Sequence, residues 1–318
     1  DGHRRHSKEQ GRTTMAVKEP ATLRLGFVGC DTSHVVQFSR RINKRGIDAE
    51  QWVDGASIVL ACPLPSAVIE QAQIDRYMTT LSDEGVAVVQ RPEELLGQVD
   101  GVLVESNDGG LHREQALPFL EAGLPVFVDK PFATSVADAQ AMLDAARRTG
   151  VPIMSASSLR YAQEVQQFQA QAATNGATLG AQTYSPASLH PRNPGLFHYG
   201  VHGVEMLYAL MGTGCSSVRC MFQEGAEVVV GTWTDGRLGL VRGTRQGTGA
   251  YGFTAFCEKG VVATPVDARF IYRELVQQIV GMFTTKTMPI PADELLEVVA
   301  FQEAALRSKE AGGDEVHL

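Results

Sequence analysis

The sequence lacks the features that would tie it to a membrane or to nucleic acid. No run approaches the roughly eighteen apolar residues that a helix needs to cross a bilayer, and the first twenty residues contain no apolar signal-peptide segment. A basic surplus is also missing, because the formal net charge is -8. Such a chain offers no basic surface to a phosphate backbone. We therefore expect small molecules or protein subunits as partners, with no nucleic acid and no membrane.

Cysteine is scarce, and its spacing is irregular. The 318 residues include 5 cysteines, an odd and scattered set without the paired spacing of a zinc site or a disulfide scaffold. They are Cys30, Cys62, Cys215, Cys220 and Cys257. Internal repeats and low-complexity segments are absent as well. A reducing, cytoplasmic location is the expectation that follows.

The chain does have enough apolar sequence for two domains, with 44% hydrophobic residues. Strand-like and helix-like segments alternate from residue 23 to 155, the pattern of a doubly wound parallel sheet. Beyond them, strand-like runs separated by glycine turns indicate an antiparallel sheet. We predict an α/β protein with a disordered tail or added leader at residues 1–20 and a Rossmann-like dinucleotide-binding domain at residues 21–155. A C-terminal α+β domain with a mostly antiparallel open sheet should follow at residues 156–318.

The first predicted strand leads into a turn that suits a nucleotide. Residues 23–28 are apolar, residues 29–34 form a short turn, and residues 35–45 have helical spacing. Exposed amides at the start of such a helix suit a pyrophosphate. The candidate cofactor residues in this turn are Gly29, Cys30, Asp31, Thr32, Ser33 and His34.

This turn departs from the usual G-x-G-x-x-G sequence. Only Gly29 remains, because Asp31 and His34 occupy the other two glycine positions. A side chain at position 31 crowds the phosphate, and its carboxylate adds a repelling charge. Pro63 follows the second strand, where an NAD-preferring site expects an acid. The choice between NAD and NADP therefore stays open.

A charged pair stands at the end of another predicted strand. Residues 126–128 favour a buried strand, and Pro131 cannot continue a hydrogen-bonded ladder, so we predict that the strand ends at Lys130. In parallel α/β sheets ligands bind at this edge, where a lysine can donate protons to substrate oxygens or hold a cofactor ribose. A lysine that only caps the strand in solvent is the alternative.

From residue 23 onward, the order of these features resembles that of the Gfo/Idh/MocA oxidoreductases. Residues 129–131, Asp-Lys-Pro, are similar to the family's Glu-Lys-Pro motif, and other segments follow in the family's order. Those segments are Glu93-Glu-Leu-Leu, the turn at His112, Glu121-Ala-Gly-Leu-Pro-Val, Leu159-Arg160-Tyr161 and Gly200-Val-His202. The resemblance implies hydride transfer between NAD or NADP and a hydroxyl or ketone of a sugar, cyclitol or related polyol.

The resemblance also suggests roles for residues. Lys130 and His202 would form the catalytic pair, with His202 moving the hydroxyl proton and Lys130 polarising the same oxygen. His198 stands where the family usually has an aspartate, so His202 lacks a counter-charge and favours its neutral form. Further cofactor candidates are Ser106, Asn107, His112, Asp129 and Lys130, and the substrate candidates are Arg160, Tyr161, His190, His198 and His202. The C-terminal domain would bind substrate and pair into a dimer or tetramer.

Two other interpretations use the same residues. If residues 197–211 are helical, His198, His202 and Glu205 project from one face and can bind zinc or another divalent ion. Such a metal, or a tightly held NAD, would suit a lyase or hydrolase on the same scaffold. The altered glycine turn supports a third hypothesis, a non-catalytic relative that binds a ligand or partner.

Overall fold

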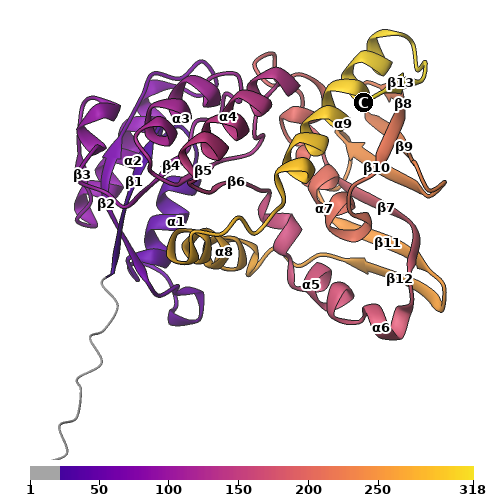
Figure 1. The fold of residues 1–318 in the computed structure, drawn as a ribbon, viewed down its shortest axis with the longest axis horizontal. Helices are drawn as coiled ribbons and strands as arrows, with labels where there is room; N and C mark the ends of the chain where they lie inside the picture. The colour runs from indigo at the N-terminus through magenta and orange to yellow at the C-terminus, as the bar shows by residue number, and fades with distance from the viewer. Residues whose placement is uncertain (1–21) are drawn as a thin grey trace, which may run out of the picture.

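A computed structural model describes residues 22–318, and the tail predicted at residues 1–20 lies outside this range. Figure 1 shows two lobes side by side, one built around the early strands and one around the later strands. Each lobe contains one sheet, of six and seven strands respectively. None of the described helices is both long enough and apolar enough to cross a membrane.

The first sheet is entirely parallel, in the order β3-β2-β1-β4-β5-β6. Its central strands are continuous apolar runs because helices cover both faces of the sheet. The strands are β1 (Leu23–Val28), β2 (Ala56–Cys62), β3 (Ala87–Val88), β4 (Gly101–Val104), β5 (Val126–Val128) and β6 (Ile153–Ser155). This topology confirms the predicted doubly wound sheet, although β5 ends two residues before Lys130.

The strand order reverses between β1 and β4, so the crossover helices lie on opposite faces of the sheet. One face carries α1 (His34–Ile42), α2 (Gln71–Asp83) and α8 (Ile271–Thr285), and the other carries α3 (His112–Glu121) and α4 (Val136–Thr149). The short helices η1 (Ala49–Gln51) and η2 (Pro92–Leu95) fill two connections. Because α8 comes from the far end of the chain, the first sheet's core includes late residues such as Phe283.

The second sheet is mixed, in the order β12-β11-β7-β10-β9-β8-β13. Only the pairing of β7 with β10 is parallel, which confirms the mostly antiparallel open sheet. The strands are β7 (Thr178–Pro186), β8 (Cys215–Gln223), β9 (Ala226–Trp233), β10 (Leu238–Thr244), β11 (Gly252–Cys257), β12 (Gly260–Pro265) and β13 (Val316–His317).

Helices cover one face of the second sheet and leave the other face open (Figure 1). The helices of this lobe are η3 (Ser158–Tyr161), α5 (Gln163–Ala170), α6 (Ala172–Asn175), η4 (Gly195–Phe197), α7 (Val201–Met211) and α9 (Ala292–Glu310). Several strand residues keep large apolar side chains exposed, namely Leu179, Met221, Leu238, Phe256 and Val261. A face of this kind is where the predicted dimer or tetramer would pair, and that assembly stays a prediction.

Candidate active site

A cleft of about 370 Å³ lies between the two lobes, at the carboxyl ends of the parallel strands. It brings together nine residues that the sequence singled out: Asp31, Thr32, Ser33, His34, Asn107, Lys130, His190, His198 and His202. It is also lined by nine residues that the sequence did not single out: Val68, Ile69, Tyr77, Ser158, Leu159, Tyr199, Tyr251, Ile271 and Tyr272. Chemistry-bearing residues from both lobes therefore share one solvent-accessible space.

The turn after β1 requires glycine at position 29. Gly29 has a φ of +78°, a region that side chains rarely adopt, and an added Cβ would lie 2.3 Å from Ser106 Oγ. This close approach packs the turn after β1 against the turn after β4. Gly29 and Cys30 are therefore structural residues beneath the cleft, since neither lines it.

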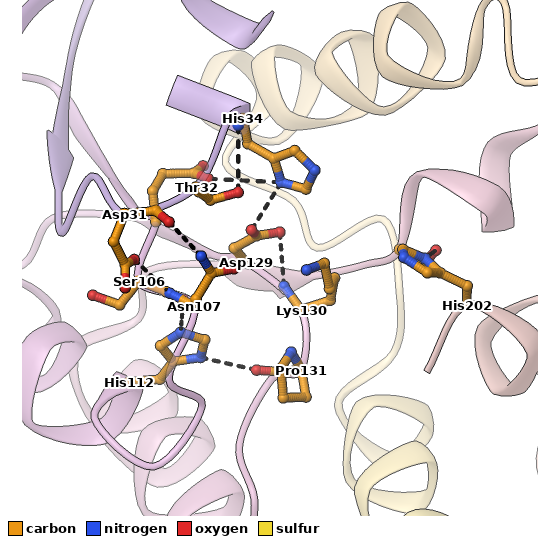
Figure 2. Close-up of polar contacts among 12 residues, drawn as sticks. Asp31, Thr32, His34, Ser106, Asn107, His112, Asp129, Lys130, Pro131 and His202 are labelled. Carbon is orange, nitrogen blue, oxygen red and sulfur yellow. Dashed lines mark hydrogen bonds and ion pairs between the residues drawn. The ribbon is translucent and has the colours of Figure 1, made fainter. Parts of the chain in front are cut away.

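Asp31, at the second glycine position, directs its carboxylate into the protein. Ser66 donates a hydrogen bond to the carboxylate at 2.5 Å, and the Asn107 amide donates another at 2.7 Å. Burial raises the pKa of Asp31, whereas these two hydrogen bonds lower it. The carboxylate thus ties together the loops after β2 and β4 (Figure 2 shows its contact with Asn107). The carboxylate that was expected to repel a phosphate thus accepts hydrogen bonds from Ser66 and Asn107.

The first turn of α1 fits an anionic group. Ser33 is the N-cap residue but makes no side-chain capping bond, and Thr32 to His34 all line the cleft. Amides at such a helix start attract phosphate oxygens through their orientation and the helix dipole. The residues here are therefore compatible with a dinucleotide pyrophosphate. No carboxylate follows β2 at Pro63, so the site gives no ribose-reading acid at that position.

Lys130 reaches the cleft from the end of β5. The Asp129 carboxylate accepts a hydrogen bond from the Lys130 amide at 2.8 Å, which holds the backbone in place (Figure 2). The Lys130 ammonium lies 5.8 Å from the centre of the Tyr199 ring, a cation–π distance. Lys130 is only 9% exposed, so it is not the solvent-facing strand cap of the alternative interpretation.

His202 faces the same cleft from the start of α7. Burial, followed by the nearby charge of Lys130, lowers the pKa of His202 to about 3, so the imidazole is neutral at physiological pH. Its Nδ1 lies 2.6 Å from Ser157 Oγ. If the ring proton is on Nδ1, Nδ1 donates a hydrogen bond to the Ser157 hydroxyl. Nε2 then remains free to accept a proton within the cleft.

His198 does not share a helix face with His202. It lies between η4 and α7, with φ and ψ of -73° and -69°, and α7 begins only at Val201. Its ring is instead 5.3 Å from the ring of His190. Burial, then the charges of Lys130 and His190, lowers the pKa of His198 to about 4. His190 and His198 thus form one wall of the cleft beside Tyr199.

The buried neutral state of His202 predicts a loss of stability in acid. Its pKa of about 3 in the folded protein lies below the roughly 6.5 of an unfolded histidine, so the unfolded chain binds the extra proton between these values. The stabilisation is fully present above about pH 6.5 and falls as the pH approaches 3. Between pH 7 and pH 5 we expect a loss on the order of 2 kcal/mol that His202→Gln lacks. Denaturant titrations of both proteins at the two pH values measure it, and equal losses would contradict it.

Comparison with known proteins shows what the chain is similar to. Residues 67–157 match the sequence model of the Gfo/Idh/MocA family, described as an oxidoreductase family with an NAD-binding Rossmann fold. The matched stretch includes Lys130 and ends before His202. A 1,5-anhydro-D-fructose reductase from Ensifer adhaerens is 36% identical over 116 residues, which span 36% of this chain and 34% of that reductase.

Solved structures share the fold over most of the chain. A myo-inositol 2-dehydrogenase from Lactobacillus plantarum superposes with a TM-score of 0.78 at 14% identity, covering 93% of this chain and 99% of the other. A myo-inositol dehydrogenase from Lactobacillus casei, solved in complex with NAD(H) and myo-inositol, superposes with a TM-score of 0.75 at 16% identity. That match covers 93% of this chain and 97% of the other. The Gfo/Idh/MocA family and these relatives are oxidoreductases.

Arg160 and Tyr161 do not line the cleft, although the sequence led us to expect both in substrate binding. Arg160 forms buried ion pairs with Glu205 and Glu294, each with an N–O distance of 2.5 Å. Tyr161 borders a separate surface hollow with Arg160. The reason is topological, because η3 runs behind α7 and directs the guanidinium toward α7 and α9. Arg160 is therefore a structural residue.

The same ion pair removes Glu205 from the metal site that the sequence suggested. Glu205 is bound to Arg160, and His198 lies before the helix that carries His202 and Glu205. Within residues 22–318, the ligand atoms of these three residues do not gather into a metal-binding group. The prediction that His198, His202 and Glu205 share one helix face was wrong, because the backbone turns between η4 and α7.

His112, Ser106 and Asp129 are buried behind the cleft and do not line it. His112 is fully buried, with Nε2 at 2.7 Å from the Ser106 carbonyl and Nδ1 at 2.8 Å from the Pro131 carbonyl (Figure 2). The imidazole thus holds the turn after β4 against the cis peptide that follows Lys130. These contacts correct the expected direct role of His112 and Ser106 at a cofactor.

A residue that was not among the predicted site residues joins the two lobes at the cleft. Asn193 accepts a hydrogen bond from the Gly109 amide at 2.9 Å and donates one to the Asn107 carbonyl at 2.6 Å. It is 1% exposed, and nearby Arg192 pairs with Asp108. The loop that carries His190 is therefore fixed to the turn after β4. The prolines beside Asn193 indicate a loop, but the neighbouring sequence does not indicate that this loop contacts the turn after β4.

The tyrosines of the cleft were missed for a related reason. Tyr199 sits inside the histidine motif and could have been considered from the sequence, whereas Tyr251 and Tyr272 come from later, unrelated segments. The Tyr251 ring packs against His202, and the Tyr272 ring packs against His34. A larger hollow of about 520 Å³ near Leu143 and Leu296 is mainly apolar and lacks a comparable group of titratable residues.

Proposed function

We propose that this protein is an NAD- or NADP-dependent oxidoreductase that acts on a hydroxyl or ketone of a sugar, cyclitol or related polyol. One observation carries the proposal: Lys130 and His202, more than seventy positions apart along the chain, line a single cleft between the lobes. The cleft also includes the start of α1, where the N-cap residue Ser33 makes no side-chain capping bond. The named activities of the family relatives support the substrate class.

Each cleft residue has a role that its chemistry allows. Lys130 provides an ammonium that can donate a hydrogen bond to the reacting oxygen and stabilise negative charge on it. Neutral His202 would accept the hydroxyl proton at Nε2, with Ser157 fixing the ring and the tautomer. Tyr199 packs between them, since its ring lies 5.3 Å from that of His202. A bound nicotinamide would supply the hydride-accepting or hydride-donating carbon.

The dinucleotide would be held mainly by backbone groups. Thr32 and Ser33 present the first-turn amides of α1 to its phosphates, and Asn107 lies on the adjoining turn. Val68 and Ile69 line the neighbouring wall, after β2. With Pro63 in place of an acid, the ribose hydroxyls receive no carboxylate from that position, and either dinucleotide is compatible with the site.

The other two hypotheses have less support. A lyase or hydrolase with a metal at His198, His202 and Glu205 does not agree with the Arg160–Glu205 pair. A non-catalytic relative was suggested by the altered glycine turn, but Asp31 is satisfied by Ser66 and Asn107. An oxidoreductase would use Lys130, His202 and the start of α1, which all face the cleft.

Calorimetric titration with NAD and NADP tests the proposal, followed by assays of reduced-nicotinamide absorbance with cyclitols and anhydro-sugars. We expect at least one dinucleotide to bind with a dissociation constant below about 1 mM, the upper end of the usual KM range. Turnover should then be measurable with a polyhydroxylated substrate. Absence of binding by both dinucleotides would overturn the proposal and favour the non-catalytic alternative.

A further inference from the structure

A second group of chemistry-bearing residues lies behind the cleft, beneath Lys130. His34 begins α1, Glu105 follows β4, and Asp129 follows β5. One ligand atom from each lies within 4.8 Å of the other two. His34 Nδ1 is 2.8 Å from Asp129 Oδ2 and 4.0 Å from Glu105 Oε2. Figure 2 shows His34 facing Asp129, with Lys130 beside them.

The two carboxylates are held in place by the sheet. The Glu105 amide donates to the Val28 carbonyl at 2.7 Å, and the Asp129 amide donates to the Val104 carbonyl at 2.8 Å. These hydrogen bonds extend the parallel pairing beyond the ends of the strands. Two acidic side chains therefore converge from adjacent strand ends with little freedom to separate.

Glu105 is the unsatisfied member of this group. Glu105 is 0% exposed, and neither of its side-chain oxygens has a hydrogen-bond partner in the described structure. Burial of an unpaired carboxylate costs several kcal/mol, so such a group normally acquires a proton, a cation or hydrogen bonds. Burial and the charge of Asp129 raise the pKa of Glu105 well above its ordinary value. The interior behind the cleft therefore contains a carboxyl group without a hydrogen-bond partner.

The nearest cations do not fill this role. Among the described residues, no ion pair within 4.0 Å joins Lys130 to Glu105 or to Asp129, although Lys130 contributes its amide to Asp129. His34 already contacts Asp129, and Nδ1 can face only one of the carboxylates closely. Asp31 adds a further negative charge near Glu105. Against the effect of burial, His34 and Lys130 lower the pKa of Asp129, whereas Glu105 has no hydrogen-bond partner of its own among the described residues.

We propose that His34, Glu105 and Asp129 bind one divalent transition-metal ion. An imidazole nitrogen with two carboxylate oxygens suits zinc, manganese or iron, whereas calcium and magnesium favour all-oxygen sites. Metal–ligand bonds of about 2.0–2.2 Å place neighbouring ligand atoms about 3–3.5 Å apart, and the observed separations of 2.8 Å and 4.0 Å bracket this value. Small side-chain movements would complete the site. His34 lines the cleft, and the two carboxylates are buried directly behind it.

This site is separate from the histidine group that the sequence suggested and from the dinucleotide proposal. It uses neither His198 nor His202, and it needs no nicotinamide. A bound cation would give Glu105 the partner that it lacks among the described residues. It would also place positive charge directly beneath Lys130 and close to the start of α1.

Metal uptake by the full chain tests the proposal. Protein dialysed against a chelator is titrated with Zn²⁺ and with Mn²⁺, with elemental analysis of washed protein and thermal melts alongside. We expect one ion per chain and a higher Tm when the ion is bound. Glu105→Gln should weaken binding by at least about 10-fold, as lost metal-site interactions do, and its Tm should no longer respond to the ion. The metal-free variant should melt at least as high as the metal-free wild type, because an amide replaces a buried acid.

Two control variants identify the site. Glu224→Gln makes the same chemical change at an exposed turn, and His198→Asn removes the rival histidine; both should retain uptake. Absence of stoichiometric binding, or equal binding by Glu105→Gln, would overturn the proposal. If Glu105→Gln does not fold, Asp129→Asn takes its place under the same criterion. Dinucleotide titration of the metal-free protein separates failure of this site from failure of the proposed function.

Discussion

Replacing Lys130 by methionine is expected to lower kcat/KM by about 10²- to 10⁴-fold, the range associated with a positioned proton donor or acceptor. Among the described residues that line the cleft, Lys130 is the one lysine or arginine. Methionine keeps an apolar side chain of similar length over the Tyr199 ring but cannot polarise a substrate oxygen. The transition state would therefore lose its ammonium partner, while the fold keeps its packing.

Steady-state kinetics of Lys130→Met, with the dinucleotide affinity measured separately, would test this expectation. Lys259→Met is the matched control, because Lys259 is exposed in the turn between β11 and β12 and its ammonium donates one hydrogen bond, to the Ala173 carbonyl. The control should keep its turnover. If Lys130→Met also turned over at the wild-type rate with a normal melting profile, the assignment of Lys130 as the polarising group would be wrong.

Replacing Arg160 by methionine is expected to destabilise the fold by about 3–5 kcal/mol, the cost of breaking a buried ion pair by removing one partner. Arg160 is 8% exposed and contacts Glu205 through Nε and Glu294 through Nη1. Burial lowers the pKa of Arg160, but Glu205 and Glu294 raise it further, so the guanidinium remains charged. The variant would leave the fully buried Glu205 without a counter-charge.

Chemical denaturation of Arg160→Met measures this loss, and Arg113→Met is its surface control. Arg113 pairs with Asp138 but its side chain is 52% exposed, so the control should lose about 0–1 kcal/mol. Glu205→Gln in the Arg160→Met background should recover part of the loss, because it removes the unpaired charge. A stable Arg160→Met protein with a sharply raised KM would instead support the substrate-binding role predicted from the sequence.

Local sequence patterns predicted two of the segments that border the cleft. The apolar run that ends before Lys130 and the turn after Gly29 were readable, because burial and chain direction place strand ends at one edge of a parallel sheet. Helical spacing was less reliable at His198. The backbone there leaves the helix, so residues four apart did not share a face.

The sequence by itself determined the parallel sheet, the open mixed sheet and the residues that carry the proposed proton chemistry, since these depend on local apolar spacing and side-chain type. Tertiary structure alone decided which of those residues meet. It turned Arg160 toward Glu205, enclosed Glu105 beside His34, and brought Tyr251 and Tyr272 to the cleft. The physical reason is that these contacts join segments distant along the chain, and their geometry depends on how two lobes pack.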